Sequence, residues 1–304
     1  MRLSLLSFAF LLSAGATLVV ADDLGDAFRN LQQAESKKDA AGVKKLAVET
    51  YRLARQETSA SAPESGEEKE AWAKRVAYVH DIELRVEYSL FATAVGTPPA
   101  TTVDLLSTLE QLNPKSKYLD QAYSLYMQAL NQTGAASQMP VVAEKAIAHF
   151  PDNEDLLLVL ADSARNRKQN DRALSYAERL VAVLSKHPKP EGMSAADWER
   201  KRNAALGRGY WIAGMVHLEK KDLFDGDRDL RAALPLIKGN NAMLISTLVQ
   251  LSLVNYQLGG ILRDRQRVLE ASRFSDQAAA IPGEHALQAW RNAQAMRNEA
   301  AKMR

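Results

Sequence analysis

The chain has 304 residues, of which 46% are hydrophobic and 25% charged, so it has enough apolar material for a folded core. Its formal net charge is only +2, which disfavours nucleic acid or an anionic membrane surface as its main partner. It contains no cysteine, which excludes disulfides, thiolate metal sites and lipid attachment at a cysteine. Aromatic residues make up 7%, and this low share together with abundant alanine favours packed helices over sheets.

Residues 1–21 have the pattern of a secretory signal peptide. One basic residue, Arg2, precedes an uncharged apolar run, and Val19 and Ala21 fit the small-residue rule for cleavage. We expect cleavage after Ala21 and a periplasmic or secreted location. The alternative is an uncleaved membrane anchor, for which the run is slightly short at about 27 Å against a hydrocarbon core of about 30 Å.

Residues 22–57 are expected to form an N-terminal helical hairpin, with apolar residues at helical spacing on both sides of a polar turn near Lys38. Residues 58–66 (TSASAPESG) have the small, polar composition of a flexible linker. A long helix is predicted over 67–94. Two prolines are expected to end it before a shorter helix over 103–112, because proline cannot continue the hydrogen-bond ladder.

A repeat of helix pairs is predicted to follow. Pro114, Pro151 and Pro188 are separated by 37 residues each, and each comes after a helical run. A fixed period in the range of 20 to 50 residues, with two helices per unit, is typical of a solenoid. The helices of these two units are predicted over 118–131, 139–150, 155–166 and 171–185, with Gly134 in the first turn.

An inserted break is predicted near 186–193, where prolines and charged residues gather. After it, Ser194 has the pattern of an N-cap for a helix that runs to Glu219, and a partner helix is expected over 224–236. These two helices form the best-defined pair of the sequence.

The C-terminal part is expected to hold one more helix pair, over 242–258 and 266–280, around a turn at Gly259 and Gly260. A terminal helix is predicted over 284–303. Leu287, Trp290 and Ala293 are expected on its packed side and polar residues on its outer side, which is what the capping helix of a solenoid needs.

The pair over 207–236 carries a characteristic order of large and small side chains. Tyr210 and Trp211 precede Gly214 in its first helix, and a small, large, small series recurs in its second at Gly226, Leu230 and Ala233. This order resembles the tetratricopeptide repeat (TPR) family, whose helix pairs follow a W-x2-L-G-x2-Y and A-x3-F pattern. The resemblance covers the chain from Tyr118 to Ala280, although the 37-residue period exceeds the family's usual 34.

The resemblance implies an all-α fold: a right-handed α-solenoid of antiparallel helix pairs, TPR-like over residues 67–304, with a terminal capping helix. It also implies a non-catalytic scaffold whose first helices line a concave groove for a protein or peptide partner. Trp211 and Met215 have a second interpretation, as core between repeats. The eight groove residues implied are Gln121, Gln128, Asp162, Arg165, Arg208, Trp211, Met215 and Gln250.

The competing hypothesis is an enzyme. None of the five histidines lies in a metal-binding spacing, and the nearest approach to a site is His80 with Asp81 and Glu83. A metal-dependent or other hydrolase of the cell envelope would use the long helix around His80. A catalytic zinc needs three protein ligands, however, so a solvated polar stripe is the simpler interpretation. We therefore expect no cofactor, no metal, no nucleic acid and no small-molecule substrate.

Overall fold

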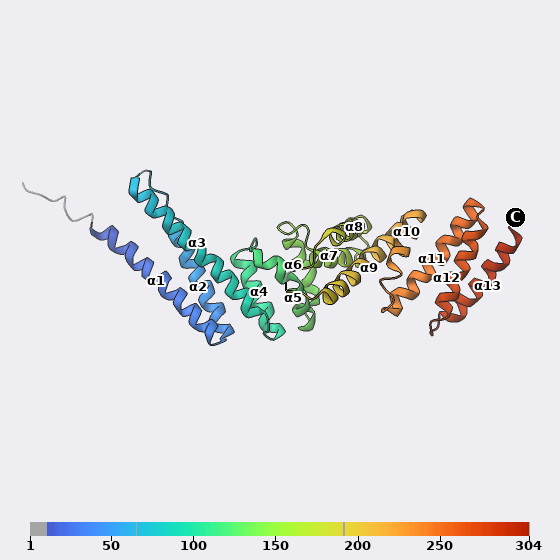
Figure 1. Ribbon diagram of the computed structural model, residues 1–304, viewed down its shortest axis with the longest axis horizontal. Helices are drawn as coiled ribbons and strands as arrows, with labels where there is room; N and C mark the ends of the chain where they lie inside the picture. Colours follow the sequence, from blue (N-terminus) through green and yellow to red (C-terminus); the bar gives the residue numbers. More distant parts are fainter. Residues whose placement is uncertain (1–10, 65, 191, 304) are drawn as a thin grey trace, which may run out of the picture. The chain divides into compact units, whose positions relative to one another are not determined.

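The computed structural model describes residues 11–64, 66–190 and 192–303, with side chains from residue 23 onward. Within these residues the chain is all-helical and contains no strand, and neighbouring helices pack on one another, which confirms the predicted fold class at that level (Figure 1). The chain divides into two compact units, Met1–Met139 and Pro140–Arg304.

The described residues of the first unit form five α-helices and one 3-10 turn, and each helix packs on the next. The second helix also contacts the fourth, and the third contacts the fifth. Fully buried leucines such as Leu31, Leu90, Leu106 and Leu130 form its core. The elements are α1 (Leu11–Ser36), α2 (Ala40–Thr58), α3 (Gly66–Ala94), α4 (Pro99–Leu112), α5 (Lys117–Gln132) and η1 (Ala136–Gln138).

The expected signal peptide falls only partly on described residues. Residues 1–10 lie outside them, and residues 11–21 belong to the helix α1. None of the helices in the described part of the chain is both long and apolar enough to span a membrane.

The helix α4 begins four residues earlier than predicted. Pro98 is its N-cap and Pro99 its first residue, so a proline that was expected to end a helix instead starts one. Proline fits there because the first N–H groups of a helix have no intrahelical partner and its fixed φ angle is already helical.

The second unit contains the remaining helices, of which α7 to α13 pack in chain order, and α9 contacts α7 and α11 as well as its sequence neighbours (Figure 1). Ser194 caps α9 as predicted, because its Oγ accepts a hydrogen bond from the Asp197 N–H (3.1 Å). The helix α6 is shorter than predicted and ends before Phe150. The elements are α6 (Met139–Ala146), α7 (Glu154–Asn166), α8 (Asn170–Lys186), α9 (Ala195–Glu219), α10 (Leu223–Ala233), α11 (Asn241–Leu262), α12 (Arg265–Ala279) and α13 (Ala286–Lys302).

One turn geometry recurs between paired helices. After α1, α5, α7, α9 and α11 one residue takes a left-handed conformation, and the next N–H bonds the carbonyl five residues back, at 2.8 to 3.0 Å. This bond is the 6→1 bond of the Schellman motif. Gly134 occupies the left-handed position after α5, as its predicted place in a turn requires. The other four positions hold the basic residues Lys38, Lys168, Lys221 and Arg263.

The predicted turn at Gly259 and Gly260 is wrong. Both residues are helical, and α11 continues to Leu262 before Arg263 ends it. Gly259 is needed for packing, since a Cβ there would lie 2.5 Å from Val268 Cγ2 of α12. Apart from its chain neighbours and the backbone of α11 itself, Gly260 has no described heavy atom within 4 Å of the position a Cβ would take.

The predicted packed side of the terminal helix is wrong in part. Ala293 is buried, but Leu287 and Trp290 are 58% and 51% exposed. The buried seam consists of residues spaced by four and three positions, and Leu287 lies two positions, about 200°, away from it. The seam toward α12 is Ala289, Ala293, Met296 and Ala300.

Candidate partner-binding surface

Three helices of the second unit position the central residues of the predicted groove. The apolar face of α7 is buried through leucines and alanines, which leaves Asp162 and Arg165 half-buried at its edge. In α9 a run of small and branched residues is buried, and Arg208, Trp211 and Met215 remain half-buried beside it. Because α9 contacts both α7 and α11, these side chains come together on one side of the unit.

Two guanidinium groups lie over the ring of Trp211. Arg208 Cζ is 4.7 Å and Arg165 Cζ 5.0 Å from the ring centroid, distances at which a cation–π contact contributes about 0.5–1 kcal/mol at an exposed site. Each arginine is in turn held by a carboxylate. Arg208 Nε donates to Asp162 Oδ1 (2.7 Å), and Arg165 Nη1 donates to Glu219 Oε1 (3.1 Å). The indole is therefore fixed by side chains from two helices.

Trp211 and Met215 also contribute to the core, as their second interpretation requires. Trp211 packs against the alanine-rich cluster between α7, α8 and α9, and both residues pack against the cluster around Leu230 and Leu248. The indole Nε1 is buried and has no hydrogen-bond partner in the described protein. The two residues thus combine a structural role with a partly exposed surface.

The other predicted groove residues are distributed over two helices. Gln250 is half-buried on α11, which α9 reaches through a contact from Arg208 Nη1 to Met243 Sδ (3.5 Å). Gln121 and Gln128 are exposed on α5, in the first unit. The structure therefore brings six of the predicted residues onto α7, α9 and α11 of the second unit.

The sequence prediction missed an exposed apolar surface of the second unit, which continues from Gln250 along α11. This helix has 22 residues and no charged one, and apolar residues lie on its exposed side as well as on its buried side. Leu253 and Tyr256 are each 40% exposed and Ile261 is 69% exposed, and together with Gln257 and Gly260 they form one exposed face. The absence of charge over 22 residues sets this helix apart in the sequence, but it predicts burial and not the exposure of this α11 stripe.

A cavity of about 500 Å³ opens beside the α11 stripe. The helices α11 and α13 both pack on α12, and the cavity is lined by residues of all three helices and by Met303, just after α13. Figure 1 shows the three helices side by side at the C-terminal end of the unit. Its single charged lining residue is Glu299, and the others are Tyr256, Gln257, Gly260, Ile261, Val268 and Met303.

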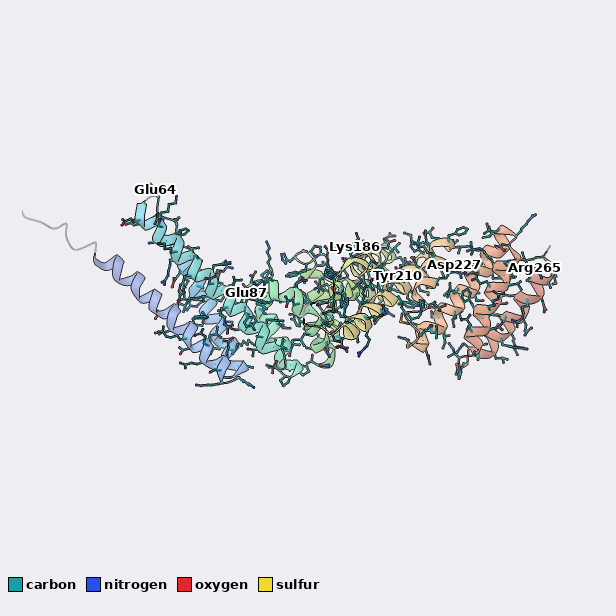
Figure 2. All side chains as sticks on the ribbon, viewed as in Figure 1. Glu64, Glu87, Lys186, Tyr210, Asp227 and Arg265 are labelled. Carbon is teal, nitrogen blue, oxygen red and sulfur yellow. The ribbon has the colours of Figure 1, made fainter. Side chains whose placement is uncertain are left out.

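A second cavity of about 420 Å³ is polar and borders a closed network between α10, α11 and α12. Arg231 donates to both oxygens of Glu270 (2.6 and 2.7 Å), to Asp227 (2.9 Å) and to Asn255 (3.0 Å). The hydrogen bonds to Glu270 raise the pKa of Arg231 further above its ordinary value, and Arg231 in turn lowers the pKa of Glu270. Asp227, labelled in Figure 2, anchors the network on α10. These side chains hydrogen-bond one another, so the network holds the three helices together.

The residues of the enzyme hypothesis do not form a ligand set. His80 is exposed, and its Nδ1 lies 3.5 Å from Glu83 Oε2, while Glu83 also pairs with Arg55 (2.8 Å). Asp81 is exposed to solvent on the same helix. In the part of the chain that the structure describes, no three His, Cys, Asp or Glu side chains are placed to hold a metal ion.

Comparison with known proteins adds no assignment. The sequence matches no protein-family model, and no curated protein is significantly similar to it. The resemblance to TPR proteins therefore stays a prediction.

Proposed function

We propose that the protein is a non-catalytic, TPR-like scaffold that binds a polypeptide partner on the face formed by α7, α9 and α11. In this proposal the helix pairs build a right-handed solenoid, and the protein acts in the periplasm or outside the cell after cleavage at Ala21. The pairwise packing and the recurring turn support the repeat architecture.

The α11 stripe is the observation that carries the proposal. A surface helix normally turns charged and polar residues toward solvent, yet Leu253, Tyr256 and Ile261 of the uncharged helix α11 are exposed. Burying apolar surface is favourable by roughly 25 cal/mol per Å², so a partner that covers the stripe gains free energy. Contiguous exposed apolar patches bordered by polar residues mark interaction sites.

The neighbouring residues on α7 and α9 suit the same role. Trp, Arg and Met are enriched in protein interfaces, and Trp211 with its two arginines is already held in place. A preorganised side chain loses little entropy when a partner binds. The arginines are neutralised by Asp162 and Glu219, so we expect the binding to depend weakly on salt.

A pull-down from envelope extract tests the proposal with three full-length proteins: the wild type, Leu253→Asp and the matched control Leu287→Asp. Both leucines are exposed, but Leu287 lies on α13, outside the α11 stripe. We expect Leu253→Asp to lose a partner that the wild type and the control retain. Identical partner profiles for all three proteins would count against the face.

A further inference from the structure

We propose that the cavity between α11 and α13 receives an amphipathic helix of the partner, which packs closely against Gly260, places an apolar side chain in the cavity and sets a Lys or Arg beside Glu299. This inference rests on the proposed function and specifies the partner segment. It is carried by an unexplained glycine, by the spacing of the exposed residues and by the charge of the lining.

Gly260 has no role in the protein's own packing. A glycine inside a helix makes the helix less stable than an alanine would, so its presence calls for a structural or functional reason. Gly259 has one in Val268 of α12. Apart from its chain neighbours and the backbone of its own helix, Gly260 has no described atom within 4 Å of the position a Cβ would take, and its φ angle is not in the positive range. It is exposed and lines the cavity. The missing side chain therefore leaves room for something outside the fold.

The stripe has the length that a short partner helix covers. Leu253, Tyr256, Gln257, Gly260 and Ile261 follow one another at intervals of three, one, three and one, so they lie on one helix face about 12 Å long. Amphipathic helices dock in apolar grooves through residues at such spacing. Two packed helices approach to 8–10 Å depending on the side chains between them, and a glycine at the contact permits the short end of that range.

The lining of the cavity fixes the chemistry of the docking segment. Val268, Ile261 and Met303 require an apolar occupant, and a volume of about 500 Å³ lies within the range of about 300–1,000 Å³ found for ligand sites. Glu299 contributes the only charge of the lining, and it is negative. Its partner Lys302 is 3.7 Å away in an exposed pair, which a cation of the docking segment can replace.

A phage-displayed library of random 16-residue peptides, selected on the full-length protein, tests the inference. We expect the selected peptides to share large apolar residues at i, i+4 and i+7 with a basic residue nearby. The variant Glu299→Lys is expected to select acidic residues in place of the basic one. Ile261→Asp is expected to weaken binding of the wild-type-selected peptides at least tenfold.

The variant Gly260→Ala separates a docking role from a structural one. Since nothing in the fold opposes a Cβ there, we expect its melting midpoint to rise by about 2 °C. We expect its affinity for the selected peptides to fall at least tenfold, because the added methyl group holds the partner helix away. Gly259→Ala serves as the contrast and is expected to lower the melting midpoint through its contact with Val268.

Three outcomes would overturn the inference. Peptides that bind Gly260→Ala and Ile261→Asp as tightly as the wild type, yet lose binding with Leu253→Asp, would leave the proposed function standing and remove the cavity from it. If the Glu299→Lys protein selected the same peptides as the wild type, the basic residue of the docking segment would have no role. A dimer in solution that Ile261→Asp dissociates would identify a second copy of the chain as the occupant.

Discussion

The long helices α3 and α11 differ in the residues that they expose to solvent. The 29-residue α3 carries Glu, Lys and Arg on its solvent side, where Arg75 and Arg85 pair with Glu57 and Glu35 of neighbouring helices. The 22-residue α11 has no charge and exposes leucine, tyrosine and isoleucine. Both helices bury leucine and valine, so the contrast between them lies mainly in their exposed faces.

The largest effects are expected on the two buried faces. Leu90 of α3 and Leu251 of α11 are both fully buried. Each Leu→Ala change should lower the free energy of unfolding by about 2–5 kcal/mol, since it removes buried methyl groups and leaves a cavity. Urea denaturation of the two variants would measure this. A loss below about 1 kcal/mol in only one of them would show that the buried faces differ.

Overpacking should cost less than truncation. Ala233 of α10 is fully buried, so Ala233→Leu has no room for its added atoms and is expected to cost about 1–3 kcal/mol. Thermal unfolding would show it as a lower melting midpoint. A midpoint equal to that of the wild type would mean that the packing around α10 is looser than described.

The network around Arg231, between α10, α11 and α12, predicts that the stability of the fold depends on pH. Arg231 lowers the pKa of Glu270, so the pair stabilises the fold above the ordinary glutamate pKa, and this stabilisation is lost as the pH falls through the lowered value. The wild type should thus exceed Glu270→Gln in stability at pH 6, and the two should converge in acid. Parallel stability curves from pH 6 to pH 3 would show that the pair contributes nothing.

The smallest stability effects are expected on the exposed faces. Arg85→Ala on α3 should cost about 0.2–1 kcal/mol, and less at high salt, because its pair with Glu35 is partly exposed. Ile261→Asp on α11 should change the free energy of unfolding by no more than about 0.5 kcal/mol while it abolishes partner binding. An equal loss of stability in both variants would remove the contrast between the helices.

The sequence predicted the helical class and several local signals, because these depend on neighbouring residues. Ser194 acts as the expected cap, and Gly134 occupies the expected turn. The glycine pair of α11 was misassigned because a glycine that permits close packing and a glycine that makes a turn have the same one-letter code. Trp290 was placed on the wrong side because the seam of small residues, which decides the packing of α13, is a tertiary property.

The sequence offered single residues for the candidate surface but not their arrangement. Arg208 and Trp211 were selected through their position in a helix pair, and the structure adds that Asp162 and Arg165 lie against them. The exposure of Ile261 could not be foreseen, since an uncharged helix predicts burial until its neighbours are known.

The recurring left-handed turn has a consequence for how this chain tolerates change. Lys168, Lys221 and Arg263 occupy equivalent positions in their turns but are separated by unequal lengths of chain. The variation in length therefore lies in the helices and in the connections between pairs, and not in the turn. The connection between α8 and α9 is long, and the free-energy cost of lengthening a loop grows only slowly with its length. The fold should therefore tolerate residues inserted between helix pairs. One residue inserted directly after Lys168 would instead break the turn and shift α8 relative to α7, on which it packs.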